Sequence, residues 1–137
     1  MSKALERPVP QPDADDGPFW AAAAQGRIVV SQCRQCWRCW VRPTPGCPSC
    51  GQSDIARIDA TGAGSLYTWV VVNRAMDDSF ADDVPYTIVV VDMDEGARVQ
   101  ARLTDSSLAL TAGLRMTVTP YLSGEWHLLG ARVRREA

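Results

Sequence analysis

The pattern of apolar and polar positions predicts one short helix before the first strands. In the segment PFWAAAAQG, Pro18 suits a first helical turn, the four alanines favour helix, and the final glycine ends it. We therefore expect a helix from Pro18 to Gln25, with Phe19 and Trp20 supplying its apolar contact. The β-branched run RIVVSQC (27–33) then predicts a strand that leads directly into a cysteine.

The second half of the chain has the pattern of an all-β domain. SLYTWVVVN (65–73) and YTIVVVDM (86–93) have the composition of strands that are buried on most of their surface. The alternating segment ARVQARL (97–103) predicts a third strand, and RMTVTPYL (115–122) and WHLLGARV (126–133) predict two more. Five strands of this length fit a small Greek-key barrel of the OB type. The expected fold class is therefore mainly β.

These elements divide the chain into three parts. Residues 1–17 combine proline and charge with little apolar content, which predicts a flexible tail. We expect residues 18–58 to hold the helix and a cysteine-rich ribbon, and residues 59–137 to form the OB-fold domain. Gly62 and Gly64 predict a bend where the first barrel strand begins.

Composition and charge narrow the classes of protein. With 46% apolar residues in a chain of 137, a folded core is expected. No run approaches the roughly 18 apolar residues of a membrane-spanning helix, and no export signal is visible, so we expect a cytoplasmic protein. The net charge of −2 hides a gradient, because residues 27–58 hold five arginines against one aspartate, whereas residues 59–129 sum to −6.

The cysteines predict a metal site. All five lie between positions 33 and 50, and an odd number without an export signal argues against a disulfide framework. Cys33 and Cys36 form one CxxC turn, and Cys47 and Cys50 form another. Each such turn directs two sulfurs at one ion, and two turns complete a tetrahedron. With Zn²⁺ bound to four thiolates, no position stays open for water, so the expected role is structural.

Two alternatives remain open at this site. Cys36-x-x-Cys39 is also a CxxC sequence. The pattern nevertheless favours Cys33, Cys36, Cys47 and Cys50 as ligands and leaves Cys39 a free thiol. Iron in a rubredoxin-like site is the main competitor of zinc, since four thiolates suit both ions. The first turn is the less regular one, because Trp37 stands where a glycine is expected, whereas Gly51 suits the positive φ of the second turn.

The chain lacks the residues of a self-sufficient enzyme. His127 is its only histidine and lies in a strand pattern, so any Ser-His or Cys-His pair would depend on it. The acidic residues occur mostly as exposed-type pairs, such as Asp77-Asp78 and Asp82-Asp83, and form no acid and base set. We expect no catalytic residue in this chain.

Two segments are candidates for binding. Arg34, Arg38 and Arg42 alternate with Trp37 and Trp40, a composition that suits phosphates and an adenine ring. The alternative is that the tryptophans pack the ribbon and the arginines are solvated. The long connection RAMDDSFADDVP (74–85) is either a contact loop or a loop that folds back on the chain.

The order of these segments resembles a known family. PFWAAAAQGRIVVSQC, CRQCWRCWVRPTPGCPSCG, TGAGSLYTWVVVNR, VPYTIVVVDMDEGARVQARL and GLRMTVTPY are together similar to the rubredoxin-like zinc-ribbon plus OB-fold proteins that accompany thiolase-like acyl-CoA enzymes. The resemblance covers residues 18–122. It matches the ribbon ligands to Cys33, Cys36, Cys47 and Cys50, whereas Trp37 and Cys39 depart from the commonest pattern.

The resemblance implies an accessory subunit. Such a protein binds a thiolase-fold enzyme subunit in a hetero-oligomer and helps to hold a CoA thioester, while the partner supplies the reactive groups. We expect C–C bond cleavage or formation of the aldolase or thiolase type, in steroid or lipid catabolism. The expected acyl-CoA or partner contacts are Arg34, Arg38, Trp40, Arg74, Phe80 and Tyr86.

Two rival functions follow from the same motifs. OB folds and zinc ribbons also occur in proteins that bind single-stranded nucleic acid. The charge of −6 over residues 59–129 argues against nucleic-acid binding, since a groove that follows a phosphate backbone is positive. The second rival is a rubredoxin-like iron electron carrier, which would be coloured.

Overall fold

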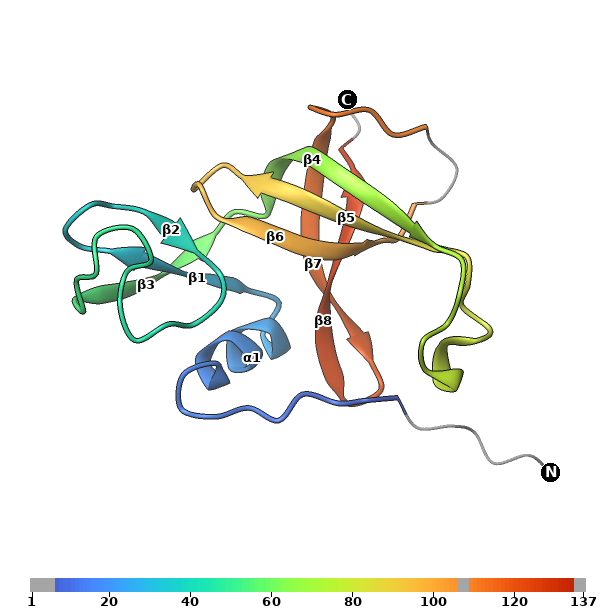
Figure 1. The fold of residues 1–137 in the computed structure, drawn as a ribbon, viewed down its shortest axis with the longest axis horizontal. Helices are drawn as coiled ribbons and strands as arrows, with labels where there is room; N and C mark the ends of the chain where they lie inside the picture. Colours follow the sequence, from blue (N-terminus) through green and yellow to red (C-terminus); the bar gives the residue numbers. More distant parts are fainter. Residues whose placement is uncertain (1–6, 106–108, 135–137) are drawn as a thin grey trace.

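The computed structural model describes residues 7–105 and 109–134, and the described chain is mainly β, as expected (Figure 1). A short helix, α1 (Gly17–Ala24), precedes a small sheet of β1 (Ile28–Cys33), β2 (Cys39–Trp40) and β3 (Ile55–Ala60). A barrel follows, built from β4 (Ala63–Val72), β5 (Tyr86–Met93), β6 (Arg98–Leu103), β7 (Arg115–Ser123) and β8 (Trp126–Val133). A 3₁₀ turn, η1 (Asp78–Phe80), lies between β4 and β5.

Parts of two predicted regions lie outside the described residues. These are residues 1–6 of the expected tail and residues 106–108 and 135–137 of the expected OB-fold domain. Within the described ranges, no helix is both long enough and apolar enough to cross a membrane.

The helix forms where the sequence predicts it, one residue earlier at each end. Pro18 lies in its first turn, and Gly26 follows it with a φ of +77° while its N–H donates to the Ala23 carbonyl at 2.9 Å. The indole of Trp20 lies edge-on to that of Trp126 at the start of β8, with ring centroids 5.8 Å apart. This contact fixes the helix against the barrel.

The small sheet has β1 at its centre, paired antiparallel with β2 on one side and β3 on the other. β3 has no clear signal in the sequence and was not predicted; its residues IARIDA pair with β1 from end to end. The domain boundary expected after residue 58 therefore falls inside this strand.

The barrel is closed in the order β4-β5-β6-β8-β7. Its neighbouring strands are antiparallel except for β6 and β8, which run parallel at Arg102–Gly130 and Leu103–Ala131. A closed five-stranded barrel with this connection confirms the expected OB-type domain.

The small sheet and the barrel share one hydrophobic core. Ile28 and Val30 of β1 and Cys39 of β2 are buried in the same cluster as Val89 and Met116 of the barrel. Complete burial of one such aliphatic side chain contributes roughly 1.5–3 kcal/mol relative to exposure. The two parts therefore pack as one body.

The entry to the barrel depends on two glycines, as predicted. Gly62 has a φ of +89°, and a Cβ at this position would lie 2.6 Å from the Val118 carbonyl oxygen. A Cβ on Gly64 would lie 2.6 Å from the Asp92 carbonyl oxygen. Both positions therefore exclude any side chain larger than hydrogen.

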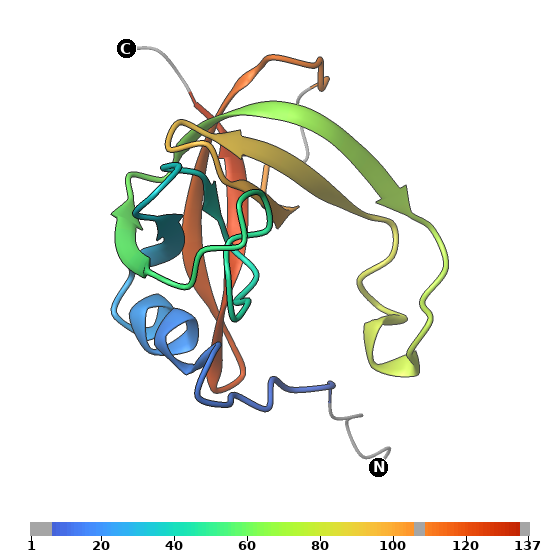
Figure 2. The same cartoon turned by 60° about the vertical axis from the view of Figure 1, so that its left-hand side comes forward.

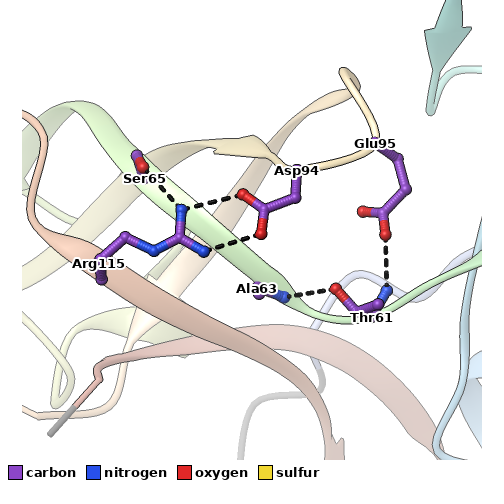
Figure 3. A network of polar contacts seen from close by, with 6 residues as sticks. All are labelled: Thr61, Ala63, Ser65, Asp94, Glu95 and Arg115. Atoms are coloured by element: carbon purple, nitrogen blue, oxygen red, sulfur yellow. Dashed lines mark hydrogen bonds and ion pairs between the residues drawn. The ribbon is translucent and has the colours of Figure 1, made fainter. Parts of the chain in front are cut away.

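A polar network closes the barrel next to this entry (Figure 3). The Arg115 guanidinium of β7 donates to both carboxylate oxygens of Asp94, at 2.9 and 2.8 Å, and to the Ser65 hydroxyl at 2.9 Å. Beside it, the Thr61 N–H donates to Glu95 at 3.1 Å. The network connects the β5–β6 turn to β4 and β7 at the point where those two strands pair.

The expectation that residues 65–73 are buried on most of their surface is wrong for the outer half of β4. Leu66 is buried, but Tyr67, Trp69, Val70 and Val71 are exposed. The cause is topological. β4 pairs with β7 only through Ala63–Ser65, whereas its pairing with β5 continues through a bulge to Val72. Its outer half therefore forms an open edge of the sheet, and at Val71 and Val72 the paired β4 and β5, here called the β4–β5 ribbon, continue beyond the residues of β5 that pair with β6 (Figure 2).

Candidate metal centre and contact surfaces

The two CxxC turns bring four sulfurs together at one end of the small sheet. The Sγ atoms of Cys33 and Cys50 lie 3.5 Å apart, and so do those of Cys36 and Cys47. All four sulfurs lie within 4.8 Å of one another. The segments that carry them form the loops at the left of Figure 1.

Backbone geometry directs these sulfurs in the same way in both turns. The N–H groups of Gln35 and Cys36 donate to the Cys33 sulfur, each at 3.4 Å. The N–H groups of Ser49 and Cys50 donate to the Cys47 sulfur, at 3.4 and 3.5 Å. Such hydrogen bonds favour the thiolate, the form that binds a metal ion.

Each turn ends in a residue of positive φ. Gly51 has a φ of +79°, as predicted for the second turn. Trp37 stands at the equivalent place in the first turn with a φ of 67°, the one positive φ of a non-glycine residue in the described chain. The turn therefore keeps the required geometry at the cost of backbone strain at Trp37.

The thiols do not ionise equally well. The N–H of Cys36, and then that of Gln35, lower the pKa of Cys33. Although burial opposes it, the N–H groups of Cys50 and Ser49 lower the pKa of Cys47 to about 6. Against the N–H of Gln52, burial and the neighbouring sulfurs raise the pKa of Cys50 to about 12. A positive ion is required before all four sulfurs can carry charge together.

The dimensions of the cluster fit a single metal ion. With Zn–S bonds of about 2.3 Å, a tetrahedron places its sulfurs about 3.8 Å apart. The observed separations run from 3.5 Å to at most 4.8 Å. Neither turn is cross-linked by a disulfide, since all four cysteines are free thiols. The cluster therefore resembles the site of a zinc ribbon.

Cys39 lies apart from this cluster. Its side chain is buried in the core that the small sheet shares with the barrel, and Gln32 Nε2 donates to its sulfur at 3.4 Å. Burial, and then the charge of Glu95, raise the pKa of Cys39, against the effect of the Gln32 hydrogen bond. Its sulfur therefore remains a neutral thiol.

The three expected contact residues of the ribbon differ in accessibility. Trp40 is buried against Cys33 and Cys47, and its Nε1 has no hydrogen-bond partner among the described residues. Arg34 and Arg38 are exposed; Arg34 Nε lies 3.5 Å from Asp54, and Arg38 donates to the Ser49 hydroxyl. Trp40 thus packs the ribbon, whereas the two arginines are open to solvent.

The other three expected contact residues belong to the connection between β4 and β5 and to the first residue of β5, a segment at the end of the molecule away from the small sheet (Figure 1). Arg74 is exposed at the end of the β4–β5 ribbon. Phe80 and Tyr86 lie close together, with ring centroids 6.4 Å apart, and line a hollow of about 910 Å³. The hollow extends to Trp126 and Leu128 of β8, and the charged residues Arg7, Arg102 and Glu125 also line it.

A clamp of three charged residues, two of which line the hollow, was not predicted. The Asp83 carboxylate lies 2.7 Å from Arg102 of β6 and 2.8 Å from Arg7 near the N-terminus. Arg7 also lies over the Phe80 ring, and Arg102 over the Tyr86 ring, each at 4.5 Å. The partners are distant in sequence, so no local pattern signals the clamp. It folds the 74–85 loop back against the barrel.

His127 is the only histidine of the chain. It lies in β8 opposite Leu122 of β7, and no hydrogen bond to its ring is found within the described part of the chain. The four-sulfur cluster and the exposed surfaces are the candidate sites among the described residues.

Comparisons with known proteins agree with this architecture. Residues 58–119 match the family model "ChsH2, C-terminal OB-fold domain". A solved structure described as "Ltp2-ChsH2(DUF35) aldolase" superposes with a TM-score of 0.78 at 26% identity, covering 91% of this chain and 98% of that chain.

Two curated relatives are similar in sequence. A protein of Thermomonospora curvata named "Probable enoyl-CoA hydratase alpha subunit" is 34% identical over 101 residues, which cover 74% of this chain and 31% of that protein. A "DUF35 domain-containing scaffold protein" of Methanocaldococcus jannaschii is 31% identical over 79 residues, which cover 57% of this chain and 55% of that protein. This chain therefore spans about a third to a half of these relatives. The resemblance expected from the sequence is confirmed.

Proposed function

From this resemblance to ChsH2 and the DUF35 scaffold proteins, we propose that the chain is a metal-stabilised accessory subunit of a thiolase-like enzyme. It binds that enzyme and helps to hold an acyl-CoA ester for C–C bond cleavage or formation. The observation that carries the proposal is the likeness, over 91% of this chain, to a chain of the Ltp2-ChsH2(DUF35) aldolase.

The chemistry of the described residues supports a non-catalytic role. Four thiolates around one metal ion leave no coordination position for substrate or water. His127 has no acid or base partner in the described chain, so the reactive groups of the enzyme belong to another chain. The metal we propose is Zn²⁺, held by Cys33, Cys36, Cys47 and Cys50, which keeps the two turns of the ribbon in place.

The hollow is the best candidate for contact with the acyl part of the ester. Phe80 and Tyr86 line it together with apolar side chains of β8, a surface that suits a hydrocarbon or sterol body. The name of the Thermomonospora relative, which includes a CoA ester, supports this class of substrate. Arg34, Arg38 and Arg74 remain proposed contacts with the anionic CoA or with the partner. Steroid or lipid catabolism and a cytoplasmic location stay predictions.

Co-purification and kinetics test the proposal. The tagged chain should capture a thiolase-like subunit from its native source, and the two purified proteins should turn over an acyl-CoA together. Phe80→Ala and Tyr86→Ala should raise KM for the ester, whereas Met76→Ala should not, since Met76 is exposed on the same loop outside the hollow. Failure of the two proteins to associate or to affect each other's turnover would exclude this function.

Metal analysis tests the structural part. We expect about one zinc per chain and a colourless protein. A visible absorption band with stoichiometric iron would show that the bound ion is iron in a rubredoxin-like site and not zinc.

A further inference from the structure

The outer half of β4 has a free strand edge without charge. From Thr68 to Val72 the strand pairs only with β5, and no backbone hydrogen bond of its other edge to described residues is found beyond Leu66. The Asn73 side chain donates to the Val71 carbonyl at 3.5 Å. The run YTWVVVN contains no charged residue and no proline. Natural edge strands are usually protected by such residues or covered by another element. This edge therefore has the properties of a strand that a partner covers.

Both faces of the outer half of β4 carry exposed side chains as well, although Val89 of β5 is buried in the core. Trp69 pairs with Val89 and Val70 with Ile88, so these neighbours on β4 point to opposite faces. Trp69 is 38% exposed, Val70 56% and Val71 47%. Exposed apolar side chains gathered on one element mark an interaction surface.

This geometry distinguishes between two occupants. A second copy of the chain, paired edge to edge along β4, would cover the edge and leave both faces in solvent. A groove in another protein covers the edge and both faces together. The outer end of the β4–β5 ribbon also projects from the barrel (Figure 2), so a groove can receive it without a clash with the small sheet.

The charges next to the ribbon define the rim of such a groove. Asp77, Asp78 and Asp82 in the loop beyond β4 form no ion pair with any described residue. At the other end, Arg98 lies 3.7 Å over the Tyr67 ring and is neutralised by Asp92. Arg74, exposed in the same loop as the three aspartates, offsets one of their negative charges. The complementary surface is therefore apolar along the outer half of β4 and, on balance, basic where it meets the loop.

We propose that the outer half of β4, residues 67–72, inserts into an apolar groove of the thiolase-like enzyme subunit. This inference rests on the proposed function and locates the surface through which it acts. The groove packs against Trp69 and Val71 on one face and Val70 on the other, and its own polar groups pair with the free edge of β4. Basic side chains at its rim face the loop carboxylates.

Binding measurements with matched variants test the surface. The probe is the thiolase-like subunit identified by co-purification, titrated with purified wild-type chain and variants. Val70→Asp should weaken binding by about tenfold or more, since a buried charge without a partner is costly at an interface. Leu122→Asp is the control, because it makes the same kind of change on an exposed strand residue of β7. Its Kd should stay within about twofold of wild type, as for an ordinary surface change.

Hydrogen exchange gives an independent reading. The amides of residues 67–72 that do not pair with β5 should become protected when the subunit is added. Thermal unfolding of Val70→Asp close to that of wild type would show that lost binding does not reflect lost folding.

The outcomes separate the surface from the function. If wild type does not bind the subunit at all, the proposed function fails. If wild type binds and Val70→Asp binds equally well, only the assignment of β4 is overturned. If wild type is a dimer in solution that Val70→Asp converts to a monomer, the occupant is a second copy and the groove is excluded.

Discussion

Cys36 and Cys39 stand three residues apart in the sequence, yet their side chains belong to different parts of the molecule. The sulfur of Cys36 lies 3.5 Å from that of Cys47 in the four-sulfur cluster, whereas Cys39 is buried in the core shared with the barrel. The positive φ of Trp37 separates them, because it ends the first turn before β2 begins. The second CxxC sequence is therefore not a second pair of ligands.

Metal content should follow this division. We expect Cys39→Ala to keep about one metal ion per chain and to lose about 1 kcal/mol of stability from the small cavity. Cys47→Ala should lose the metal and unfold the ribbon turns, since the second turn then supplies one ligand. Elemental analysis of both purified variants measures the difference. A metal-free Cys39→Ala protein would contradict the ligand set.

The reactivity of Cys39 should be low. Burial is the largest of the effects that raise the pKa of Cys39, so at neutral pH its side chain is a neutral thiol in the folded protein. Alkylation by iodoacetamide, followed by mass spectrometry, should label Cys39 only after unfolding. Rapid labelling in the native protein would mean that the core around β2 opens readily.

The Asp83 clamp should make stability depend on pH in the acidic range. Hydrogen bonds from Arg102, and then from Arg7, lower the pKa of Asp83 below its ordinary value, against the effect of burial. The clamp therefore contributes fully above the unfolded-state pKa of about 3.9 and is lost as the pH falls through the lower folded pKa.

Asp83→Asn should show the same dependence. We expect it to cost about 1 kcal/mol at neutral pH and nothing at a pH below the folded pKa of Asp83, as measured by urea unfolding. Asp82→Asn is the control, since Asp82 forms no ion pair with a described residue. An equal loss of unfolding free energy in both variants at neutral pH would show that the Asp83 clamp does not stabilise the fold.

The glycines at the barrel entry should tolerate alanine in a defined order. Gly62→Ala combines a positive φ with a clash against Val118 and should cost about 3 kcal/mol or more. Gly64→Ala meets the clash alone and should cost about 1–3 kcal/mol. Gly96→Ala meets open space at a φ of +103° and should lose about 1–2 kcal/mol.

Gly17→Ala provides the reference for this series. It has neither constraint and should be close to neutral. Urea unfolding of the four variants gives the order, and a Gly62→Ala protein as stable as wild type would contradict the tight entry bend.

The sequence predicted the elements whose signal is local. β5 begins and ends where the run YTIVVVDM predicts, and the turn glycine Gly51 has the expected positive φ. The ligand cysteines are close in sequence, so their spacing alone suggested that they meet. Trp37 was recognised as irregular because a glycine is expected at that point of a turn.

The remaining features depend on distant partners. IARIDA becomes β3 because β1 offers it a free edge, which its mixed composition does not reveal. The outer half of β4 has the composition of a buried strand, but composition does not say whether the covering surface belongs to the same chain. The contact of Arg7 with Asp83 joins residues far apart in sequence and has no local signature.

The common core of the small sheet and the barrel has a thermodynamic consequence. Ile28, Val30 and Cys39 connect strands next to the metal ligands with Val89 and Met116 inside the barrel. Free energy gained when an ion binds the four sulfurs is therefore available to the whole described fold. Metal availability would act as a control on how much folded barrel a cell contains, and so on how much surface is ready to receive a partner.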